Sequence, residues 1–161
     1  MNRLTSWRTT TAAHARRLKK RSAANLAWRK PPEELVFFLD RQLGRYKMAT
    51  VLRAADLRVE VHDDHFRQDA LDPEWLTAVG EKNWIVVTRD ERIRYNLAEK
   101  QAMRRAKVRA FVLAAQGDLR AAMLAQNFLR ALAKIRRVVE EQNPPFIAKI
   151  SRSGDVTVLD F

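Results

Sequence analysis

The sequence contains no cysteine and no apolar run near the roughly 18 residues that a membrane-spanning helix needs. The missing thiols exclude disulfide bonds and thiolate metal sites, and they favour the reducing cytoplasm as the compartment. The first residues also lack the apolar core of a secretion signal, so we do not expect export. These absences predict a cytoplasmic protein that has no membrane partner.

Acidic residues are missing from the first 32 positions, which carry nine of the 31 Lys and Arg residues. The rest of the chain contains the other 22 basic residues and all 19 acidic ones, so most of the net charge of +12 belongs to this N-terminal arm. Such an arm suits a phosphate backbone, an anionic lipid or an acidic protein. A solvated arm without a ligand, or an organellar transit segment, is the alternative. Pro31 and Pro32 end the arm, and we expect a basic arm at 1–32 and a domain at 33–161.

The domain alternates strand and helix patterns, and 47% of the whole chain is hydrophobic, which suits a globular core. Strands are expected at residues 34–40, 57–61, 84–88, 109–113, 146–150 and 156–159. Helices are expected at 43–56, 72–80, 89–105 and 117–141, and a polar loop at 62–69. The fold class is therefore α/β, with a mostly parallel sheet between two helical layers and a C-terminal β-hairpin at its edge.

Three aspartates fall where such a sheet forms its binding sites. Asp40 ends the first strand, Asp90 follows the third by two residues, and Asp72 begins the helix after the second. Because the carboxyl ends of parallel strands meet at one edge, we expect these side chains to converge. Grouped carboxylates repel one another, and a hard divalent cation such as Mg²⁺ or Mn²⁺ offsets that repulsion. The chemistry this predicts is metal-dependent hydrolysis of a phosphodiester.

Each acid also has a structural explanation. Asp72, before Pro73 and Glu74, has the signature of a helix N-cap, and Asp90 could likewise only start a helix. Asp40 is harder to explain in this way, because an acid at the end of an apolar strand does not help the core.

These pieces resemble the PIN superfamily, and more narrowly the short PIN-like, VapC-type toxins of bacterial toxin–antitoxin operons. The matching segments are Val36-Phe-Phe-Leu-Asp40, Asp72-Pro-Glu-Trp-Leu76 and Trp84-Ile-Val-Val-Thr-Arg-Asp90, with weaker likeness at 90–95 and 109–113. The resemblance covers about residues 34–160 and leaves the arm unexplained. It implies a PIN-like fold and a ribonuclease that cuts single-stranded RNA with Mg²⁺ or Mn²⁺. It also implies a cognate antitoxin that blocks the acidic pocket. A homodimer is left open.

One departure concerns a fourth acid, which longer PIN domains carry on a helix after the first strand. The corresponding helix here has only Asp56, at its far end. Glu99 or Asp64 could take this place. A catalytically degenerate protein that binds RNA or a protein partner is therefore the alternative function.

Basic residues near the proposed edge could hold the phosphate backbone. Arg94, Arg89 and Arg45 are the candidates, and Arg94 is preferred because it lies about one helical turn beyond Asp90. A salt bridge from Arg94 to Glu91 or Glu99 is the structural alternative. His62 and His65 flank two aspartates, but their spacing matches no metal signature, and a solvated loop is expected there.

Overall fold

The computed structural model describes residues 29–44, 46–114 and 120–161, and the fold below is that of residues 31–161. Most of the predicted basic arm and Arg45 lie outside the described residues. So do Gly117 and Asp118, the expected start of the last long helix.

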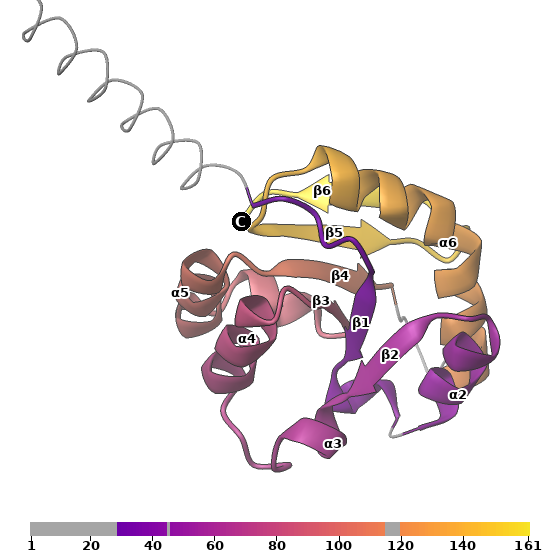
Figure 1. Ribbon diagram of the computed structural model, residues 1–161, viewed down its shortest axis with the longest axis horizontal. Helices are drawn as coiled ribbons and strands as arrows, with labels where there is room; N and C mark the ends of the chain where they lie inside the picture. Colours follow the sequence, from indigo (N-terminus) through magenta and orange to yellow (C-terminus); the bar gives the residue numbers. More distant parts are fainter. Residues whose placement is uncertain (1–28, 45, 115–119) are drawn as a thin grey trace, which may run out of the picture. The chain divides into compact units, whose positions relative to one another are not determined.

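Six strands form one sheet in the order β2-β1-β3-β4-β5-β6 (Figure 1). They are β1 (Val36–Leu39), β2 (Arg58–Val61), β3 (Ile85–Thr88), β4 (Arg109–Leu113), β5 (Phe146–Ile150) and β6 (Val156–Leu159). The first five are parallel, and β6 pairs antiparallel with β5 at the edge. Each predicted strand is present, so the mostly parallel sheet with a terminal hairpin is confirmed.

Helices cover both faces of the sheet (Figure 1). On one face lie α2 (Lys47–Ala54) and α6 (Ala121–Glu141), and on the other α4 (Asp72–Glu81) and α5 (Leu97–Ala106). Side chains alternate across the sheet, so Phe37 packs with Phe128 of α6 while Phe38 packs with Trp75 of α4. The predicted α/β/α architecture is thus observed, and each face of the sheet has its own apolar core.

Two predicted helices and one predicted loop differ in the structure. The segment at 43–56 is a 3-10 turn, η1 (Arg41–Leu43), followed by α2 after Gly44, whose φ of 74° suits glycine. The segment at 89–105 is also divided, into η2 (Glu91–Arg94) and α5, because Asn96 accepts hydrogen bonds from the N–H groups of Ala98 and Glu99 and so caps a new helix. The loop at 62–69 contains a short helix, α3 (His62–His65).

The strand order places a topological switch point between β1 and β3. From β1 the chain continues to β2 on one side, whereas β3, β4 and β5 follow on the other. In open parallel sheets, the crevice outside the carboxyl ends of the strands at such a point is the usual ligand site. No described helix has the length and apolar character needed to cross a membrane.

Candidate active site

The Thr88 hydroxyl joins Asp40 and Asp90 at the switch point. Asp40 continues β1 by donating its N–H to the carbonyl of Val87, at 3.0 Å. Thr88 at the end of β3 donates its Oγ1 to Asp40 Oδ2 at 2.9 Å, and the same oxygen accepts the N–H of Asp90 at 3.0 Å. Thr88 was not among the predicted site residues. The sequence feature that could have identified it is a threonine at the end of an apolar strand, two residues before Asp90.

Asp40 is almost completely buried, with 6% of its surface exposed. Burial raises the pKa of this carboxyl, and the charge of Asp72 raises it further, against the lowering effects of the Thr88 hydroxyl, the Arg41 N–H and the Arg41 charge. A carboxylate in this position costs free energy to desolvate and contributes nothing to the apolar core.

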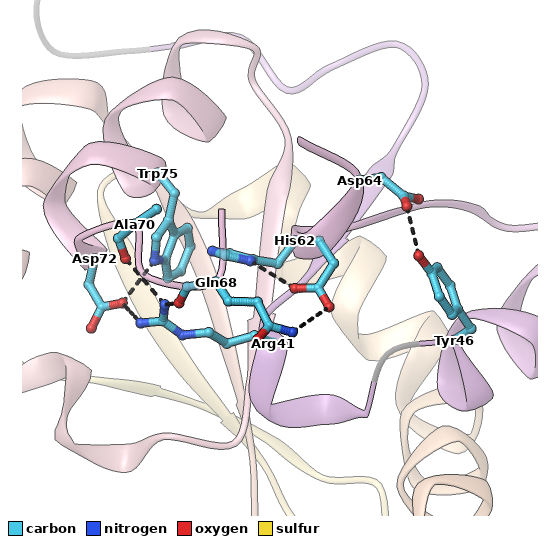
Figure 2. Close-up of polar contacts among 9 residues, drawn as sticks. Arg41, Tyr46, His62, Asp64, Gln68, Ala70, Asp72 and Trp75 are labelled. Atoms are coloured by element: carbon cyan, nitrogen blue, oxygen red, sulfur yellow. Dashed lines mark hydrogen bonds and ion pairs between the residues drawn. The ribbon is translucent and has the colours of Figure 1, made fainter. Parts of the chain in front are cut away.

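Asp72 lies at the first residue of α4 and is not its N-cap, which is Leu71. The capping explanation for Asp72 was therefore wrong. Its Oδ1 accepts from Arg41 Nη2 at 2.7 Å and from Trp75 Nε1 at 2.9 Å (Figure 2). Arg41 also donates to the carbonyls of Gln68 and Ala70, at 2.5 and 3.2 Å. Arg41 directly follows Asp40, so its guanidinium links the end of β1 to the segment that leads into α4.

Asp90 does start a helical turn, as the structural alternative supposed. Its Oδ1 accepts the N–H of Arg92 at 2.9 Å, which caps η2, and Nε of the same arginine lies 3.2 Å away. About a fifth of the Asp90 side chain is exposed. Capping and a role in binding are compatible, because the cap uses one carboxylate oxygen.

Glu99 lies in the first turn of α5 and interacts electrostatically with all three aspartates. Desolvation is the largest cause that raises the pKa of Glu99 to about 7, followed by the charge of Asp72, a hydrogen bond with Asp72, and the charges of Asp90 and Asp40. The fold therefore brings Glu99 into one electrostatic group with the aspartates. Asp64 lies elsewhere: it is exposed and accepts from the Tyr46 hydroxyl at 3.0 Å, apart from the Arg41–Asp72 contact (Figure 2).

The predicted phosphate-binding arginines differ in their surroundings. Arg89 lines a groove with η1, α2 and the start of α6. Arg94 lies over the Tyr95 ring, 4.5 Å from its centroid. Glu91, one of its two suggested ion-pair partners, accepts instead from Lys149 at 2.8 Å.

The expectation of a solvated loop holds for Asp64 and His65, which are exposed, but it was wrong for His62. His62 is fully buried among Phe38, Phe66 and Trp75, and its Nδ1 lies 3.4 Å from Asp63 Oδ1. His65 pairs with Glu60 at 2.6 Å. Period-two and helical patterns do not reveal this burial, because two of the three aromatic residues, Phe38 and Trp75, come from other elements of the fold.

Within the described residues, no three His, Asp or Glu side chains are arranged closely enough to form a ready metal site. The hydrogen bonds offer a reason, because Thr88, Arg41 with Trp75, and Arg92 each hold one carboxylate. The donor set nevertheless suits a hard cation, because it supplies only oxygen. Desolvation is the largest cause that raises the pKa of Glu99, and the charges of the three aspartates add a repulsion that a cation would relieve.

Comparisons with known proteins identify the family of the segment that carries these residues. A family model described as "PIN like domain" matches residues 35–115, which include Asp40, Asp72, Asp90 and Glu99. A protein named "Putative ribonuclease VapC45" from Mycobacterium tuberculosis (strain ATCC 25618 / H37Rv) is 29% identical over 126 residues, covering 76% of this chain and 90% of that protein. No solved structure matches the chain significantly.

Proposed function

The chain belongs to the PIN-like domain family, and from this premise we propose that it is a metal-dependent endoribonuclease that cleaves single-stranded RNA. One observation carries the proposal: Thr88 bonds both the Asp40 carboxylate and the Asp90 backbone N–H at the switch point of the sheet, and the charges of Asp40, Asp72 and Asp90 all act on Glu99. The matching relative, itself named a ribonuclease, supports the reaction class.

In this proposal Asp40, Asp72 and Asp90 hold the cation, Mg²⁺ or Mn²⁺, and Glu99 is the fourth acid. When bound, such a cation supplies an activated water and neutralises charge that develops on the phosphodiester. Neighbouring side chains orient the aspartates that would hold the cation. Thr88 holds Asp40 through Oδ2, and Arg41 and Trp75 hold Asp72 through Oδ1. These hydrogen bonds orient each carboxylate separately and leave the three aspartates apart, so a bound cation would have to draw them together.

Asp64 is left out of this set because its carboxylate is bonded to Tyr46 and is exposed. Arg89 and Arg94 remain the candidates for phosphate contact, on opposite sides of Asp90 in the chain. Arg45 was a third candidate, but it lies outside the described residues.

The biological role that we propose is that of the toxin in a toxin–antitoxin pair, with a cognate antitoxin protein as partner. The support is the resemblance to VapC-type toxins and the relative's name. An antitoxin that covers the carboxylates would keep the ribonuclease inactive until it is removed.

The test is cleavage of a single-stranded RNA pool with Mg²⁺ or Mn²⁺, beside an EDTA control. Asp40→Asn and Asp90→Asn should abolish cleavage and leave the melting temperature near that of the wild type. Asp56→Asn is the matched control, because Asp56 precedes β2 at the opposite end of the sheet and has φ of 61°, which asparagine tolerates. Full activity in either site variant would overturn the mechanism.

A second function has one observation in its favour. The three aspartates are not preassembled as a metal site within the described residues, and Arg41 already neutralises Asp72. A degenerate PIN-like protein that binds RNA or a protein partner without cutting would look like this. Well-folded protein that binds RNA but shows no metal-dependent cleavage would support this alternative.

A further inference from the structure

The helices that start at the carboxyl edge of the sheet differ in charge between its two faces. On the α4 and α5 face, the first turns contain Asp72, Glu74 and Glu99. On the α2 and α6 face, neither first turn contains an acid. Instead α2 begins at Lys47, and Arg120 is the N-cap of α6. Within the described residues, acids thus occur in the first turns of these helices on only one face of the sheet.

A groove with a volume of about 890 Å³ lies on the α2 and α6 face. The charged residues that line it are Lys47, Arg89 and Arg120, and no acidic residue is found among its described lining. Apolar side chains, including Val51 and Leu124, form much of the remaining wall. Lys47 and Arg120 are exposed, so their charges face solvent and are available to a ligand.

Two residues that line the groove are close in sequence to proposed metal ligands. Arg89 directly precedes Asp90, and Gln42, which also lines the groove, is two residues beyond Asp40. If one phosphate of a bound RNA lies at Asp40 and Asp90, the neighbouring phosphates must lie on one or the other side of that point. Toward α4 and α5 they would meet Glu74 and the carboxylates that hold the cation, whereas toward α2 and α6 they would meet cations that have no such role.

We infer that this groove binds the segment of single-stranded RNA that flanks the scissile phosphate, with Lys47, Arg89 and Arg120 on its phosphates. The inference rests on the proposed ribonuclease function and adds the path of the substrate. The apolar wall gives sugars and bases a surface to contact, which cations alone would not provide. An acidic protein segment is the competing occupant, and the test below distinguishes it.

The experiment measures binding of a short fluorescent single-stranded RNA to full-length protein in the Asp90→Asn background, with Mg²⁺ and at several salt concentrations. The groove variant is Lys47→Ala/Arg120→Ala, and Lys47→Glu/Arg120→Glu is a second variant that reverses the charges. Arg137→Ala is the matched control, because Arg137 is an exposed cation near the far end of the same helix α6. Melting temperatures verify that all variants fold.

If the groove binds RNA, the alanine pair should weaken binding on the order of twentyfold at 0.1 M salt and lower the log–log salt slope by about 1.4, the value for two lost contacts to a single strand. The charge-reversed pair should weaken it further, and Arg137→Ala should have little effect. Wild-type protein that cleaves RNA, together with unchanged affinity in both groove variants, would overturn the inference and leave the proposed function standing.

Two other outcomes would overturn the inference differently. Wild-type protein that neither cleaves nor binds RNA would remove the proposed function and this inference with it. Binding of polyglutamate that needs Lys47 and Arg120, without RNA binding that needs them, would assign the groove to an acidic protein segment.

Discussion

Arg41 Nη2 lies 2.7 Å from Asp72 Oδ1, so the residue directly after one candidate metal ligand forms an ion pair with another. The same guanidinium bonds two backbone carbonyls of the loop that leads to α4. A single side chain thereby links the segment after β1 to the start of α4, across 31 residues of sequence from Arg41 to Asp72.

Replacing Arg41 with alanine should destabilise the protein by roughly 1–3 kcal/mol, because the change leaves partly buried acceptors without their charged donor. Urea denaturation measures this difference. Arg67→Ala is the control in the same loop, since Arg67 pairs with Asp69 while 86% of its side chain is exposed, and a change within about 0.5 kcal/mol is expected there. Equal effects of the two substitutions would contradict the role given to Arg41.

Replacing Thr88 with valine should reduce cleavage or metal affinity by roughly 10–100-fold, because the hydroxyl that positions Asp40 and Asp90 is lost. Thr88→Ser keeps the hydroxyl and should restore most of the activity. The readout is cleavage rate as a function of Mg²⁺ concentration, in which Thr88→Val should need more metal. Wild-type behaviour of Thr88→Val would show that the hydrogen bonds only stabilise the strand end.

Glu99 makes the metal-free protein sensitive to pH. Its folded-state pKa of about 7 lies above the ordinary value of 4.5, so its ionisation favours the unfolded chain and stability is lost as pH rises between these values. Glu99→Gln removes that loss. In EDTA, the variant should therefore gain more in melting temperature over wild type at pH 8 than at pH 5.

The control for this experiment is Glu140→Gln, which makes the same chemical change at an exposed position of α6. Its effect should be similar at both pH values. A gain for Glu99→Gln that does not depend on pH would show that the four acids do not act on one another as the structure indicates.

Gly80 of α4 should not tolerate alanine, although Gly→Ala in a helix ordinarily stabilises by about 1 kcal/mol. A Cβ there would lie 2.6 Å from the Ala106 Cβ and 2.8 Å from both the Ala106 carbonyl oxygen and a methyl of Val108. The overpacking should cost roughly 1–3 kcal/mol in urea denaturation. Adding Ala106→Gly should recover part of the loss; stabilisation by Gly80→Ala alone would contradict the tight packing of α4 on α5.

Much of the fold could be predicted because its patterns are local. A run such as Val36-Phe-Phe-Leu39 is buried on both faces, and all four residues are indeed buried, as a central parallel strand requires. The order of strands and helices then indicated which strand ends share an edge of the sheet. Asp40 and Asp90 could therefore be assigned to that edge from the sequence. The cap at Asn96 was missed, because the pattern of apolar residues continues across it.

By itself, then, the sequence determined the parallel sheet, its two helical layers and the edge at which the aspartates lie, because strand direction follows from chain order and burial pattern. Only the tertiary structure decided which side chains hold those aspartates, that Glu99 joins them and Asp64 does not, and that His62 is buried. The reason is physical. These contacts depend on side chains from separate elements, whose distances are fixed when the helices pack on the sheet.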